Sequence, residues 1–159
     1  MVTEALALAM RVLLGVGVVL ATVTPMHASD GAGGAVASAQ VLARAQMLYA
    51  QQHYREAIDV LDALPESAPP DARVHLLLGK AYGRLAEHVP WYRALIHARR
   101  CGTELERAVE LDPRNRDALA ALARFYEEAP ALVGGGADKA APLRERLRAL
   151  DPVPAPNRP

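Results

Sequence analysis

His97 and Cys101 are the two residues whose types and spacing best suit metal binding. They lie four residues apart, so a helix would place both on one face, and imidazole and thiolate both bind zinc. Two ligands do not make a site, however, and His53, His75 and His88 show no spacing that adds a third. Cys101 is the only cysteine, which excludes an intrachain disulfide and a multi-cysteine centre. We therefore expect a buried, apolar Cys101 and predict neither a metal nor a cofactor.

The glycine run from Gly134 to Gly136 is the closest approach to a phosphate-binding loop. A Walker loop follows a strand and ends in Gly-Lys-Ser or Gly-Lys-Thr, and this run has neither feature. The glycines predict instead a turn with positive φ that leads to Asp138 as the N-cap of a helix. Anion binding at the start of that helix is the alternative interpretation.

No arrangement of residues predicts catalysis. After residue 28, serine occurs only at Ser29, Ser38 and Ser67, all in expected linkers or loops, with no Gly-x-Ser-x-Gly elbow. Glu127 and Glu128 are adjacent, so a helix would point them to different sides and they would not converge as an acid–base pair. The sequence predicts that the protein is not an enzyme.

The composition favours one helical domain without nucleic acid as its main partner. Apolar residues make up 52% of the chain and aromatic residues only 4%, with Ala and Leu dominant. This balance suits helices that pack through small residues, so we predict an all-α fold. The 18 basic and 18 acidic residues cancel, whereas binding to phosphates needs a basic surplus.

The N-terminus is expected to direct export. Arg11 precedes an apolar run from Val12 to Val23, and small and polar residues follow it. This order is typical of a secretory signal peptide, so we predict a signal at 1–28 and a periplasmic protein. A retained membrane anchor is the alternative. Residues 29–39, rich in Gly, Ala and Ser, are expected to form a flexible linker, and 153–159, rich in Pro, a disordered tail.

Helical periodicity extends from residue 40 to residue 150. Apolar residues recur at three- and four-residue steps in the segments 40–50, 54–64, 71–85, 91–111, 115–126 and 138–150. The fourth segment is either one long helix or two, because Gly102 would cost about 1 kcal/mol inside a helix and Thr103 could begin a second. The last segment begins at Asp138 or Pro142.

Two of these segments end in the same phrase, an aliphatic residue followed by Asp and Pro. Proline stops a helix because it lacks the N–H and disfavours helical geometry in the residue before it. Pro113 and Pro152 end the two phrases and lie 39 residues apart. A stop signal that recurs in this way indicates a repeated helical unit.

The repeated unit resembles the tetratricopeptide repeat, which has 34 residues and two helices. Leu78-Gly79 with Tyr82 matches the phrase of its first helix, and Leu122-Ala123 with Tyr126 matches it less well. Tyr54 with Ala57, and Ala108 with Pro113, match parts of the second helix. Leu48 and Tyr82 are 34 residues apart, and the longer spacings that follow imply ten extra residues around 89–95 and five at the glycine run. Trp91 lies in the first insertion and is expected to be partly exposed while it covers the junction with the next hairpin.

The resemblance implies a right-handed α-solenoid of about three helical hairpins over residues 40–152, the middle hairpin enlarged. In such a fold the first helix of each hairpin lines a concave surface that binds a protein or peptide. The phrases Phe125 to Pro130 and Gly134 to Ala140 also resemble small exported bacterial tetratricopeptide proteins. Some of these are similar to the periplasmic component associated with TRAP-type solute transporters. We therefore predict a non-catalytic periplasmic interaction module and keep, as the alternative, a small-ligand-binding accessory of such a transporter, for which a homo-oligomer would complete the pocket.

The residues expected on the concave face are those of the first helices that lie away from the core stripe. They are Gln46, Tyr49, Arg73, Lys80, Arg84 and Arg124. Four of the six are cationic, which suits a carboxylate such as a peptide C-terminus or an acidic segment. The alternative is that these cations are solvated and paired with Asp117, Glu127 and Glu128.

Overall fold

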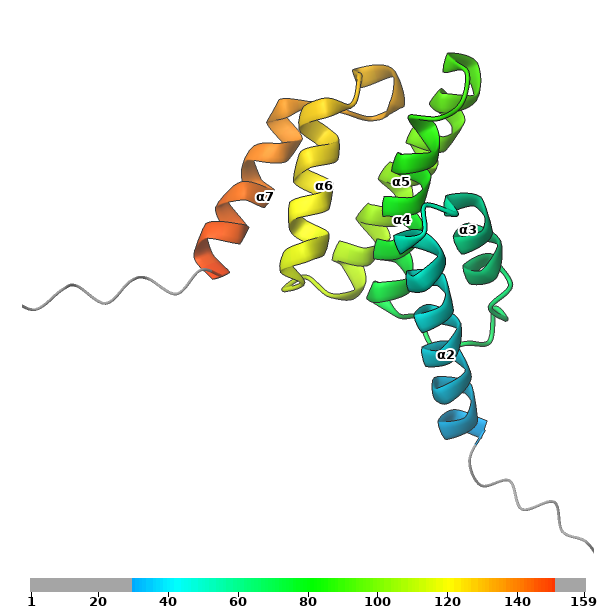
Figure 1. The fold of residues 1–159 in the computed structure, drawn as a ribbon. Coiled ribbons are helices and arrows are strands. Elements are labelled where there is room, and N and C mark those ends of the chain that lie inside the picture. Colours follow the sequence, from blue (N-terminus) through cyan, green and yellow to red (C-terminus); the bar gives the residue numbers. More distant parts are fainter. Residues whose placement is uncertain (1–29, 151–159) are drawn as a thin grey trace, which may run out of the picture.

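The computed structural model describes residues 30–150, and their side chains from residue 36. Within that range every regular element is a helix, which confirms the predicted all-α class (Figure 1). The elements are α2 (Asp30–Ala50), α3 (Tyr54–Asp62), α4 (Ala72–Ala86), α5 (Trp91–Leu111), α6 (Arg116–Glu128), the 3₁₀ turn η1 (Ala131–Val133) and α7 (Ala137–Leu150). None of the described helices is long and apolar enough to cross a bilayer.

Neighbouring helices pack in consecutive pairs, α2 on α3, α4 on α5 and α6 on α7 (Figure 1). The pairs are joined by contacts of α3 with α4 and of α5 with α6. In addition, α4 touches both α2 and α6, so the first helices of the three pairs are neighbours. This arrangement places α2, α4 and α6 along one side of the molecule.

The core consists of two clusters of buried side chains that meet at α4. Leu42, Ile58 and Leu77 belong to the cluster that α2 and α3 form with one face of α4. Leu76, also on α4, belongs to the other cluster, which is built mainly from α5, α6 and α7. Half-buried Tyr82 packs against both clusters. Because α4 is apolar on two faces, it couples the two halves of the core.

Local signals set three of the described helix boundaries. Asp71 is the N-cap of α4, where its carboxylate accepts the Arg73 N–H at 2.8 Å, and Asn115 caps α6 by accepting the Ala118 N–H at 3.0 Å. Helix α5 ends at Leu111, directly before Asp112-Pro113, as the sequence predicts.

Residues 30–39 differ from the expected linker, because α2 already begins at Asp30. Four alanines stand in this stretch, and extending an existing helix requires far less free energy than starting one. The expected signal peptide at 1–28 and tail at 153–159 lie outside the described residues.

Helix α5 is continuous through Gly102, so a second start at Thr103 is not needed. A β-carbon at Gly102 would lie 2.7 Å from the Phe125 ring, which means that glycine is required here for α6 to approach α5. The Thr103 hydroxyl instead donates to the Arg99 carbonyl at 3.2 Å, one turn back. The preference of glycine for helix ends is outweighed by this close packing.

The extra residues around 89–95 form the turn before α5 and its first turn. Trp91 is 76% exposed, more than expected, and contacts the ring of Tyr92 at 6.1 Å. The prediction that Trp91 is exposed is therefore right in direction. The Trp91 side chain does not, however, cover a junction between helices. With so little area buried, Trp91→Ala should cost well under about 1 kcal/mol of stability.

The glycine run forms the predicted turn in part. Gly134 has φ of 102°, whereas Gly135 is needed for close approach, since a β-carbon there would lie 1.8 Å from the Ala129 carbonyl oxygen. Asp138 is not the N-cap, because α7 begins one residue earlier at Ala137 and continues through Pro142. Asp138 lies in the first turn, where a negative charge also suits the helix dipole.

Candidate functional site: a groove along α4, α5 and α6

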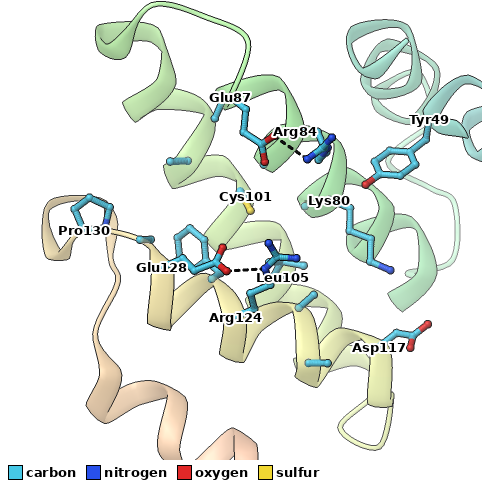
Figure 2. A pocket seen from close by; sticks show the side chains of 18 residues that line it. Tyr49, Lys80, Arg84, Glu87, Cys101, Leu105, Asp117, Arg124, Glu128 and Pro130 are labelled. Carbon is cyan, nitrogen blue, oxygen red and sulfur yellow. Dashed lines mark hydrogen bonds and ion pairs between the residues drawn. The ribbon is translucent and has the colours of Figure 1, made fainter. Parts of the chain in front are cut away.

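A groove of about 570 Å³ runs between α4 and α6, with α5 beneath it and Tyr49 of α2 at one end (Figure 2). Its lining residues are Tyr49, Gly79, Lys80, Gly83, Arg84, Ala86, Glu87, Ala98, Cys101, Leu105, Asp117, Ala120, Ala121, Arg124, Phe125, Glu128, Ala129 and Pro130. Most of them come from the first helices of the three packed pairs. The groove therefore lies on the side that the sequence predicts to be the binding face.

Small residues at the base give the groove its depth. Gly79 and Gly83 lie one turn apart on α4, and Ala98 and Cys101 lie on the facing side of α5. A β-carbon at Gly79 would be 2.7 Å from the Leu105 side chain, so glycine is needed here for α4 to pack against α5. On α6, the small side chain of Ala121 leaves space at the opposite wall of the groove. The base is thus apolar and has room for a ligand side chain.

The rim carries three cations and three carboxylates. Arg84 pairs with Glu87 on α4 at 2.8 Å, and Arg124 pairs with Glu128 on α6 at 2.8 Å (Figure 2). Lys80 and Asp117 are the remaining two charged groups. No ion pair joins Lys80 to a carboxylate within the described part of the chain. The rim is neutral in sum but can offer both signs of charge to a ligand.

Hydrogen bonds to neighbouring side chains raise the pKa values of both arginines above their ordinary value. The Tyr54 hydroxyl, which accepts from Arg84 Nε at 3.4 Å, is the main cause of a raised Arg84 pKa, followed by Glu87. Glu128 raises the pKa of Arg124 in the same way, through a hydrogen bond from Nε. Arg84 also lies over the Tyr54 ring, 5.8 Å from its centroid. Each guanidinium therefore has a hydrogen-bonding partner beside the groove.

Four of the six residues predicted for the concave face line this groove, namely Tyr49, Lys80, Arg84 and Arg124. Gln46 is exposed on α2 outside it. Arg73 is also outside, because it lies two turns from Lys80, and Asp71 holds its guanidinium at the start of α4 at 2.6 Å. Helical spacing alone does not show how far along α4 the groove extends.

The sequence interpretation missed the carboxylates at the rim and the small residues at the base. Glu87 is three residues after Arg84, a spacing that favours an ion pair on a helix and could have indicated it. Glu128 pairs with Arg124 as the alternative interpretation expected, whereas Glu127 pairs across to Arg144 of α7 at 2.6 Å. The pair Gly79 and Gly83, one turn apart, was the available signal for the base.

His97 and Cys101 do not form a metal centre. The two residues have different neighbours. The His97 ring stacks on the Tyr82 ring with centroids 6.0 Å apart, whereas Cys101 lies at the base of the groove. Burial lowers the pKa of His97, so its neutral form is favoured. Among the described residues no group of three or more His, Cys, Asp or Glu side chains is placed to hold a metal.

Cys101 should be unreactive in the folded protein. It is 7% exposed, and burial raises the pKa of its thiol to about 12, so almost no thiolate exists near pH 8. A thiol-specific chromogenic reagent should react with Cys101 more than about a hundredfold more slowly in buffer than in denaturant. Equal rates in the two conditions would show that the base of the groove is open to the reagent.

Comparison with known proteins adds no family assignment: no protein-family model, no curated protein and no solved structure matches this chain. The resemblance to the tetratricopeptide repeat therefore depends on the quoted phrases and on the pattern of helix contacts.

Proposed function

We propose that this protein is a non-catalytic, tetratricopeptide-like interaction module that binds a peptide segment of a partner protein in the groove. In this proposal the three helix pairs are successive repeats of a right-handed solenoid. Support comes from α2, α4 and α6, which are neighbours on one side, and from Leu78-Gly79, whose glycine packs tightly against Leu105 of α5. The location that we propose is the periplasm, because residues 1–28 have the order of a signal peptide.

One observation carries the proposal: an apolar base of small residues lies between two ion-paired arginines and Lys80. A peptide side chain of moderate size fits above Ala98 and Ala121, and burying it supplies affinity. A carboxylate on the same peptide binds Lys80. It also accepts hydrogen bonds from Arg84 or Arg124, and so replaces Glu87 or Glu128 as the partner of that arginine. Because the rim is neutral in sum, selectivity comes from these local contacts and not from long-range attraction.

The first test is selection of groove ligands from a displayed library of random dodecapeptides with free C-termini, using the full chain as bait. For a selected peptide, Lys80→Ala with Arg84→Ala should weaken binding by about tenfold or more, since charge-assisted hydrogen bonds contribute about 1.5 to 3 kcal/mol. Ala120→Leu should weaken it similarly without altering any charge, because the added carbons occupy the groove. Fluorescence anisotropy of the labelled peptide measures both effects.

Arg73→Ala is the matched control, since Arg73 is an exposed cation of the same helix but lies outside the groove. It should leave peptide affinity unchanged. If Arg73→Ala weakened binding as much as the Lys80 and Arg84 pair, or if Ala120→Leu had no effect, the peptide would not occupy the groove.

The volume of the groove also falls within the range of small-molecule sites, which keeps the transporter-accessory alternative open. The same variants separate the two. A short monocarboxylate or dicarboxylate that bound as tightly as the selected peptides, with the same loss in Lys80→Ala, would favour a small ligand over a protein partner.

A further inference from the structure

Apolar side chains gather at the end of the molecule where α5 begins. Of six large hydrophobic residues that are strongly exposed in the described chain, four lie here: Trp91 at 76%, Tyr92 at 53%, Ile96 at 62% and Leu132 at 65%. We call these four residues the aromatic tip. They are not needed for the core, since none of them belongs to either buried cluster.

The four side chains lie on the first part of α5 and on η1, two elements that contact each other. The Trp91 and Tyr92 rings meet edge to face at 6.1 Å, and Ile96 follows Tyr92 by one helical turn. Arg99, on the same side of α5, donates to the Leu132 carbonyl at 3.3 Å and so ties η1 to the helix. Figure 1 shows the α4–α5 turn projecting at the same end of the molecule as η1. The tip is therefore a projecting surface and not a groove.

The two segments that carry the aromatic tip contain basic but no acidic residues. Residues 88–103 contain three arginines and no acidic residue, and residues 129–137 contain no acidic residue either. Arg93 lies over the Tyr92 ring, 5.9 Å from its centroid, and Arg99 is beside Leu132. On the neighbouring elements, Glu87 pairs with Arg84 at the groove. A chain of zero net charge thus places a local basic surplus around exposed aromatic and aliphatic groups.

Exposed Trp and Tyr with flanking Arg match the boundary between lipid headgroups and acyl chains. The rings enter the apolar layer while their N–H and O–H groups remain at headgroup depth, and arginine stems extend so that the guanidinium contacts phosphate. Anionic lipid adds electrostatic attraction for each nearby cation. A projecting basic and apolar end complements a broad, negatively charged surface. We propose that the aromatic tip binds the surface of an anionic lipid bilayer and so holds the groove near a membrane.

Trp91 provides the direct test, because it is the only tryptophan in the chain. The full chain is titrated with vesicles of equal phosphatidylglycerol and phosphatidylcholine, and separately with vesicles of phosphatidylcholine alone. Trp91 emission should shift to shorter wavelength with the anionic vesicles, and bromine-labelled lipid should quench it. The shift should decline with added salt and be much smaller with phosphatidylcholine alone. Residues 1–28 are themselves apolar, so emission from Trp91, and not sedimentation, reports on the tip.

Variants that retain Trp91 give the quantitative result. Ile96→Ser with Leu132→Ser should weaken binding to anionic vesicles by about tenfold or more, because both lose apolar area that lipid would cover. Arg93→Gln with Arg99→Gln should reduce the preference for anionic lipid by a similar factor. Met47→Ser is the control, since Met47 on α2 is 63% exposed but lies outside the tip, and it should bind as the wild type does.

Three outcomes would overturn the proposal. The first is unchanged Trp91 emission with anionic vesicles at low salt. The second is that Met47→Ser reduces the shift in Trp91 emission as much as the tip variants do. The third is a shift that grows with protein concentration in the absence of lipid, which would make the tip a contact between copies of this chain.

Discussion

Replacing Leu119 with Ala is expected to lower the free energy of unfolding by about 3 to 5 kcal/mol. Leu119 is fully buried in α6, at 0% exposure, and belongs to the cluster that joins α5, α6 and α7. Truncation removes apolar contacts and leaves a cavity that fixed helices cannot fill. The total free energy of unfolding of a domain of this size is about 5 to 15 kcal/mol. The loss should therefore be obvious in urea denaturation followed by circular dichroism.

Leu132→Ala is the matched control for this substitution. Leu132 is 65% exposed on η1, and its truncation should change the free energy of unfolding by less than about 0.5 kcal/mol. If Leu119→Ala cost no more than Leu132→Ala, α6 would not pack on α5 and α7 as described.

The second large effect is expected at Gly79. Its β-carbon position lies 2.7 Å from Leu105, which is itself only 2% exposed and cannot move aside. Gly79→Val should therefore push α4 from α5 and lower the free energy of unfolding by about 2 to 3 kcal/mol. Thermal denaturation monitored by circular dichroism would show the reduced stability.

Gly83→Ala gives the comparison one turn along the same helix. Its β-carbon would lie 3.3 Å from the Cys101 sulfur, a contact that a shift of a few tenths of an ångström relieves, and alanine favours the helix. We expect little net change in stability. A greater loss for Gly83→Ala than for Gly79→Val would mean that the closest approach of α4 and α5 lies elsewhere.

Much of the helical fold was predictable because local signals agree with the periodicity. Asp71 and Asn115 cap helices where expected, and Asp112-Pro113 ends α5. The two departures arise where a local preference competes with something else. Gly102 suggests a break, but packing against Phe125 keeps the helix continuous, and the glycine-rich stretch 30–39 extends a helix that is already formed.

The candidate site was predictable in direction but not in extent. Spacing on α4 placed Lys80 and Arg84 on the groove side, and it placed Arg73 there as well, although Asp71 holds that residue at the helix start. Whether a cation meets a ligand or a neighbouring carboxylate depends on distances between side chains, and a helical pattern does not contain them. The pairing of Arg84 with Glu87 is the clearest case.

Mapping of backbone amide chemical shifts during titration with a selected dodecapeptide tests the proposed function most directly. The largest changes are expected at the small residues of the groove, Gly79, Gly83, Ala98 and Ala121, with little change at Arg73. Changes confined to Asp62 and Glu104, which do not line the groove, or to the aromatic tip, would contradict the proposal.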